Sequence, residues 1–204
     1  ARQRFTFGTI YVHGDEDPVL PPNDPVWVDS LYYINYLNNY RPSTITRGVF
    51  LKEGQHYSAR AEENTSSYLQ SYGVFRKVTI NFTEDSVRPG VLNTDVLLYP
   101  QKRWSLFTEL NGVAKSNNFV GPGMRVGFKD RDLFRGAETF SADLNGSFET
   151  QVAGAQKGTH AYEWGGTVSL KIPRIVPFHF LRTARAAVPT TRIDLGYGLF
   201  RRID

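Results

Sequence analysis

Residues 134–148 run FRGAETFSADLNGSF, and small or apolar side chains alternate with polar ones along most of this stretch. A period of two is typical of a β-strand that has one apolar face. Strands of globular proteins usually contain about 5–6 residues, whereas a tilted strand that crosses a membrane needs about 9–11. The length favours a membrane strand, and a strand of a soluble sandwich remains the alternative.

The same alternation recurs in four more stretches, at 103–113, 119–129, 160–172 and 191–199. We predict one strand for each, so that residues 101–204 hold about five antiparallel strands of a β-barrel. Bacterial barrels use an even number of strands, eight or more, and about five strands cannot close. We therefore expect an incomplete barrel and a native protein that continues past Asp204.

Residues 1–100 show a different order of elements. Strands are predicted at 4–12, 75–82 and 91–98, and a stretch at 31–37 is ambiguous between a strand and a helical turn. A short helix is expected from Pro42, and a longer helix is expected between an N-cap at Ser58 and a C′ glycine at Gly73. This order predicts a small α+β domain.

Composition excludes several classes of function. The chain has 204 residues, no cysteine and a formal net charge of +4 with scattered basic residues, so we expect no thiol chemistry and no nucleic-acid partner. The four histidines lack the spacing of a metal site or a catalytic triad, and there is no Gly-rich phosphate loop. We expect no catalytic residue, no cofactor, no metal and no enzymatic activity.

An acidic trio, Asp15-Glu16-Asp17, lies in a Pro-rich stretch after the first predicted strand. The trio could bind a cation, but no ligand spacing follows it. A solvated acidic loop is the favoured interpretation.

Two motifs carry a family resemblance. The stretch from Gly54 to Ser58, followed by Leu69, Gly73, Phe75 and Val78 at their spacing, resembles the second half of a polypeptide-transport-associated (POTRA) domain. The stretch 129–138 (KDRDLFRGAE) resembles the periplasmic turn between the second and third barrel strands of the BamA/TamA outer-membrane assembly family. Its motif residues are Arg131, Asp132, Leu133, Phe134, Arg135, Gly136 and Glu138.

The resemblance covers most of residues 42–172, and the long stretch at 13–40 looks like variants found in TamA-like lipoproteins. The fold class it implies is an α+β POTRA-like domain (1–100) followed by antiparallel β strands of a truncated transmembrane β-barrel (101–204). It places the barrel in the outer membrane of a Gram-negative bacterium and the N-terminal domain in the periplasm.

The function that the resemblance implies is insertion or assembly of outer-membrane proteins. The partners would be unfolded client proteins, outer-membrane lipid, and a partner protein in the periplasm or inner membrane. Two other classes remain open: a two-partner-type secretion pore and a soluble periplasmic β-rich binding module. A basic connection at 173–189 either rests on lipid headgroups or packs under the barrel.

Two strands are the candidate client sites, because an exposed strand edge can pair with an extended chain. The resemblance implies an edge strand made of Arg76, Lys77, Val78, Thr79, Ile80, Asn81 and Phe82. It also implies a lateral seam along the first barrel strand, with Trp104, Leu106, Thr108 and Leu110. Inward side chains of the edge strand would pack against the helices while its backbone pairs with a client.

Overall fold

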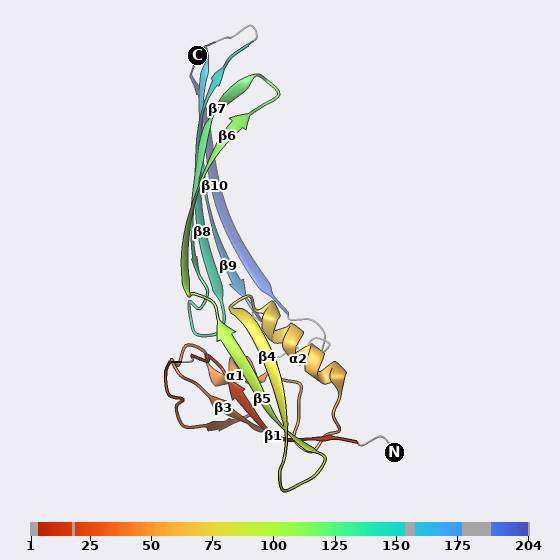
Figure 1. The fold of residues 1–204 in the computed structure, drawn as a ribbon. Coiled ribbons are helices and arrows are strands. Elements are labelled where there is room, and N and C mark those ends of the chain that lie inside the picture. Colours follow the sequence, from red (N-terminus) through yellow and green to blue (C-terminus); the bar gives the residue numbers. More distant parts are fainter. Residues whose placement is uncertain (1–3, 18, 154–157, 177–188, 204) are drawn as a thin grey trace. The chain divides into compact units, whose positions relative to one another are not determined.

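A computed structural model describes residues 4–17, 19–153, 158–176 and 189–203. The chain divides into two compact units. The first unit comprises residues 1–103, 131–138 and 172–191, and the second comprises 104–130, 139–171 and 192–204. Each unit is built on one five-stranded sheet (Figure 1).

The first sheet has the strand order β2-β3-β1-β5-β4. Its strands are β1 (Thr6–His13), β2 (Val26–Val28), β3 (Leu31–Ile34), β4 (Phe75–Glu84) and β5 (Val91–Pro100). Strand β1 runs parallel to β3 and β5, while the β2–β3 and β4–β5 pairs are antiparallel. The edges of this sheet are therefore the very short β2 and the longer β4.

Two helices belong to this unit, α1 (Pro42–Thr46) and α2 (Ala59–Ser71). Pro42 opens α1, where its fixed φ suits the first turn and its missing N–H costs nothing. Gly73 follows α2 with a φ of +74°, the left-handed conformation that ends many helices. Helix α2 lies along β4, and Leu69 on the apolar face of the helix is buried (Figure 1).

The core of the first unit forms between its sheet and its helices. Alternate residues of the strands point into it, among them Val12, Val96 and Leu98, all without exposed surface. Leu69 and Tyr72 approach from the α2 end of the core. One face of this sheet is therefore buried by protein, as the period-two pattern requires.

The second sheet has the strand order β10-β9-β8-β7-β6. Its strands are β6 (Trp104–Ala114), β7 (Phe119–Asp130), β8 (Thr139–Gln151), β9 (His160–Ile172) and β10 (Thr191–Ile203). The register of β6 on β7 runs without a break from the Trp104–Asp130 pair to the Ala114–Val120 pair. No helix among the described residues is long and apolar enough to cross a membrane.

The predicted fold class, a POTRA-like α+β domain followed by strands of a truncated barrel, is wrong. The described chain is mostly β, with two five-stranded sheets and two helices, and no POTRA α+β domain is evident in it. One physical reason lies in residues 13–40, where β2 and β3 form and widen the first sheet to five strands. Another is that α1 contains only five residues.

The strand predicted at 134–148 also begins later than expected. Residues 134–138 form a turn, and β8 begins at Thr139. Arg135 and Ala137 adopt φ values of +62° and +61°, which are incompatible with a strand. The carboxylate of Glu138 accepts a hydrogen bond from the Gly136 N–H at 2.8 Å, and Asp132 accepts one from Ala137.

Candidate functional site

The second sheet presents one apolar face that no other described element covers. In the pairs Phe128–Ala142 and Ala142–Val168 the side chains of neighbouring strands share this face. Leu106, Leu110 and Leu195 are 73%, 79% and 72% exposed on it. Contiguous exposed apolar patches mark sites of contact with another protein, a ligand or a membrane, so this face is a candidate contact surface.

Aromatic residues and a shallow groove mark this face on its central strands. Phe148 packs on Tyr162 with ring centroids 5.1 Å apart, and Trp164 packs on Tyr197 at 5.8 Å. A groove of about 450 Å³ runs between Leu110 and the rings of Phe148, Tyr162 and Trp164. Gly146 lines the groove and leaves space there because it has no side chain.

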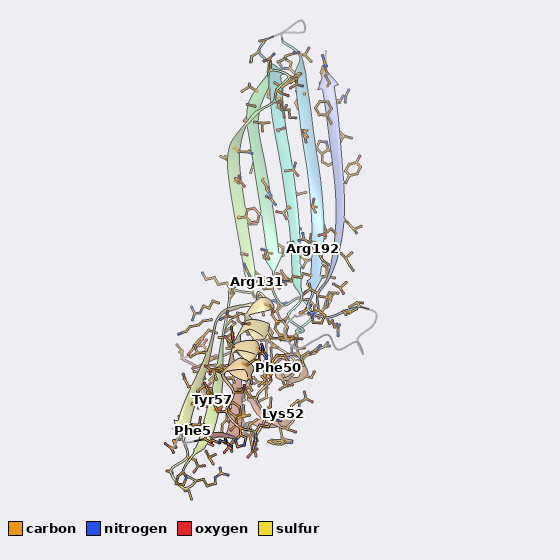
Figure 2. The ribbon with its side chains drawn as sticks, turned by 90° about the vertical axis from the view of Figure 1, so that its right-hand side faces the viewer. Phe5, Phe50, Lys52, Tyr57, Arg131 and Arg192 are labelled. Carbon is orange, nitrogen blue, oxygen red and sulfur yellow. The ribbon has the colours of Figure 1, made fainter. Side chains whose placement is uncertain are left out.

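The opposite face of the same sheet carries ion pairs. Arg125 contacts Asp143 at 2.9 Å, and the Lys115 ammonium lies 2.9 Å from Glu149 and 2.8 Å from Glu163. The carboxylates of Asp143 and Glu149 are therefore both paired with basic side chains. Figure 2 shows side chains on both faces of these strands.

The polar face is concave. The Lys115 ammonium lies 5.6 Å from the centre of the Phe200 ring, and the Arg202 guanidinium lies 5.9 Å from that of Phe119. These contacts bring β10 close to β7 and to the turn after β6. Strands β7 and β10 are three positions apart in the sheet, and neighbouring strands lie about 4.8 Å apart, so in a flat sheet these side chains would be too far apart to meet. The curvature leaves Glu149 only 1% exposed, with its Oε2 atom unpartnered.

Strand β6 forms one edge of the second sheet, so the side away from β7 has no strand partner among the described residues. Its sequence, WSLFTELNGVA, contains no Pro and no Lys, and its register on β7 contains no bulge. Natural edge strands are usually protected by such devices. The predicted seam residues Trp104, Leu106, Thr108 and Leu110 share one face of this edge strand.

Strand β4 forms an edge of the first sheet and carries the other predicted client residues, 76–82. Unlike β6, it has two exposed basic residues, Arg76 and Lys77, and a register shift between Phe75 and Lys77. Val78 is buried in the core, and Ile80 and Phe82 pack against it. The inward side chains of β4 thus hold the strand in place while one side of its backbone stays at the edge.

The turn 131–138 belongs to the first unit. The Arg135 guanidinium donates to the backbone and side-chain oxygens of Asn38, and the Arg135 carbonyl accepts the Arg41 N–H at 2.8 Å. Ala137 is 1% exposed and joins the core, whereas Phe134 is exposed. These contacts hold Arg135 and Ala137 in place, although both are non-glycine residues with positive φ.

Asp15 is fully buried and does not lie in a solvated loop. Its carboxylate accepts hydrogen bonds from the backbone N–H groups of Tyr36, Leu37 and Asn39 at 2.7, 3.0 and 3.1 Å. These bonds explain why an acid is needed at this position. No group of three or more potential metal ligands occurs among the residues that the structure describes.

Sequence reasoning missed several of the residues that shape these surfaces. It did not single out Lys115, which lies in the turn after β6 and links two carboxylates. Nor did it single out Phe107, whose ring covers Gly127 on the polar face. The sequence signal that could have identified Phe107 is the glycine on the polar face of the next strand, Gly127, which pairs with it in register. The predicted basic connection at 173–189 lies partly outside the described residues, which exclude 177–188.

Comparison with known proteins shows a distant similarity in structure. No family model matches the chain, and no curated protein matches it. Among solved structures, the chain is similar to BamA from Haemophilus ducreyi lacking POTRA domains 1–3, with a TM-score of 0.39 and 12% identity. The match covers 91% of this chain and 41% of that structure, so the chain spans less than half of its length.

Proposed function

We propose that the protein acts at the outer membrane of a Gram-negative bacterium and assists the assembly of other β-rich membrane proteins. An extended client segment would add to the edge of β6 from Leu106 to Ala114, forming backbone hydrogen bonds with the N–H and C=O groups on the side of the strand away from β7. The observation that carries this proposal is that β6 is an eleven-residue edge strand that contains no bulge, no Pro and no Lys.

The apolar face supports a location in lipid. A client strand added beside β6 would continue the exposed row of Leu106 and Leu110, and its own apolar side chains would face the same hydrocarbon. A soluble periplasmic module would need a second layer over this face, and no described element supplies one. Outer-membrane lipid is therefore the second partner in the proposal.

The edge of β4 would provide a separate client contact in the periplasm, where a further partner protein could also bind. Arg76 and Lys77 limit pairing at one end of the strand, so we expect weaker and more selective pairing than at β6. The proposed activity is binding and templating, without chemical catalysis. A secretion pore would use the same edges, but no contact in the structure favours a single dedicated client.

Cysteine crosslinking tests strand addition at β6. The chain has no native cysteine, so a thiol introduced at Thr108 or Leu110 is unique. A client β-strand peptide with one cysteine should form disulfides at both positions, since the two residues share one face of the edge strand. Leu144→Cys is the matched control, because it lies on the apolar face of β8, which is paired on both sides.

Crosslinks at 108 and 110 that shift in step with the position of the peptide cysteine would support backbone pairing in register. Equal crosslinking at 144, or none along β6 with any client, would overturn the proposed function. The assay is run in nonionic detergent and in lipid vesicles, since the proposal places the apolar face in lipid.

A further inference from the structure

A small polar pocket lies in the first unit. Its volume is about 90 Å³. Three segments that are far apart in the chain supply its polar lining, namely Arg41, Ser43, Arg47, Gly136, Glu138 and Arg174. All three segments belong to the same compact unit.

The charges in the pocket are unbalanced. Three guanidinium groups face one carboxylate, which leaves a formal excess of two positive charges. Glu138 does not neutralise an arginine, because it forms no ion pair with a described residue and its Oε2 accepts the Gly136 N–H at 2.8 Å. Like charges gathered in a small cavity repel one another, so a bound anion would stabilise the arrangement.

The arginines differ in how they are held. The Arg47 side chain donates to the Ser43 carbonyl at 3.1 Å and to the Thr44 hydroxyl at 3.5 Å, which fixes its position and leaves other N–H groups available. The side chains of Arg41 and Arg174 form no hydrogen bond or ion pair with any residue that the structure describes. Two full sets of guanidinium donors at the pocket are therefore unused.

The volume limits what can bind. Sites for drug-sized molecules usually measure about 300–1,000 Å³, and one water occupies about 30 Å³ of liquid. A cavity of about 90 Å³ has room for one small group such as a tetrahedral oxyanion. A nucleotide base or a sugar would have to remain outside.

We propose that this pocket binds a phosphate group, either as inorganic phosphate or as the phosphomonoester of a lipid headgroup. A phosphate monoester carries about −1.5 to −2 charges near neutral pH, which matches the excess of two. The planar fork of arginine suits phosphate oxygens, and the pocket contains three arginines and no lysine. The bound group would connect α1, the turn 131–138 and the segment after β9.

Phosphorus NMR with inorganic phosphate provides the first test, on the full chain in nonionic detergent. Phosphate should bind saturably and raise the unfolding temperature above that in chloride at equal ionic strength. The double variant Arg41→Gln/Arg174→Gln should raise the half-saturating concentration at least tenfold, because it removes two positive charges from the pocket, and neither side chain forms a hydrogen bond or ion pair with a described residue that its loss would break. Arg60→Gln, at an exposed position of α2, should bind like the parent chain.

Glu138→Gln protects the test against simple misfolding. The amide oxygen can still accept the Gly136 N–H, while the loss of one negative charge raises the excess in the pocket to three. Phosphate should then bind more tightly, a gain that a damaged fold would not produce. Weaker binding by this variant, or equal effects of phosphate and chloride on the parent chain, would overturn the proposal.

Detergent micelles doped with lysophosphatidic acid or with lysophosphatidylcholine distinguish the two sources. Retention by the phosphomonoester lipid that is lost in Arg41→Gln/Arg174→Gln would identify a lipid headgroup. Binding of inorganic phosphate alone would identify a free phosphate ion. Lipid retention that persists in the double variant, together with no phosphate binding, would overturn the assignment to this pocket.

Discussion

The two sheets of this chain use the same alternating pattern with opposite results. In the first sheet the apolar side chains of β1 and β5 lie against helices, and Val12, Val96 and Leu98 have no exposed surface. In the second sheet the apolar side chains of β6 to β10 remain exposed, with Leu110 at 79%. A period of two therefore specifies an apolar face but does not specify what covers it.

The difference between the sheets also concerns their edges. Strand β4 has basic residues and a register shift, whereas β6 has neither. An uncovered apolar face marks a contact surface, and an unprotected edge is useful only if another strand pairs with it. Both features occur together in the second sheet, and this coincidence is the basis of the function proposed for it.

The largest expected effect separates the two apolar faces. Leu98→Ala should cost about 2–5 kcal/mol of unfolding free energy, because it leaves a cavity in a fully buried core. Leu110→Ala should cost less, since its side chain is exposed and detergent fills the space that it leaves, so that no cavity forms. Urea unfolding in nonionic detergent measures both values, and equal losses would contradict the contrast between the two faces.

A charge placed on each face of the second sheet sharpens the comparison. Leu144→Asp puts a carboxylate on the apolar face and should weaken vesicle binding by on the order of 2 kcal/mol. Asn145→Asp, at the next residue and on the polar face opposite Arg125, should bind like the parent chain. Vesicle flotation measures both variants. If they float equally, the apolar face does not contact lipid.

The sequence predicted the strands of the second sheet because their alternation is long and continuous. The alternation alone extended the strand over residues 134–138, because Phe134 and Gly136 happen to continue the pattern, whereas the family resemblance implied a turn at 129–138. The hydrogen bonds that fix that turn are local and run from the backbone N–H groups of Gly136 and Ala137 to the side chains of Glu138 and Asp132. Such features leave no periodic signal.

The first sheet was harder to predict because short strands resemble loops. Strand β2 has three residues and lies in a polar, Pro-rich stretch, so nothing local distinguished it. Without β2 the first unit was taken for a smaller α+β domain, which is the error in the predicted fold class. The phosphate pocket was also invisible, because Arg41 and Arg174 meet only in the folded chain.

Buried tyrosines of the first unit predict a loss of stability at alkaline pH. Burial, and then the nearby Asp15 carboxylate, raise the pKa of Tyr33 above its ordinary value of 10.0, and burial also raises the pKa of Tyr72. Unfolded tyrosines lose their protons first, so stability falls as the pH rises above about 10. At about pH 11 each such tyrosine should cost about 1 kcal/mol.

Tyr33→Phe separates this effect from general alkaline damage. The Tyr33 hydroxyl is buried and has no hydrogen-bond partner among the described residues, so its removal should be neutral or stabilising near pH 8. The loss between about pH 8 and pH 11 should become smaller by about 1 kcal/mol in urea unfolding. An unchanged loss would mean that Tyr33 does not titrate on unfolding.

The smallest expected effect lies in the turn between β4 and β5. The Arg88 side chain and the backbone N–H groups of Val87 and Arg88 hold the Asp85 carboxylate, which lowers its pKa from 3.8 to about 2. As the pH falls below 3.8, the unfolded chain binds the proton first, so the stability that this turn contributes is lost between about 3.8 and 2. Because this ion pair lies at the surface, with the Arg88 side chain 56% exposed, screening keeps the effect small. Asp85→Asn should remove the dependence of the urea midpoint on pH in this range. Arg88→Gln should reduce that dependence only in part, since the two backbone donors remain. If both variants keep the slope of the parent chain, the acid sensitivity arises elsewhere.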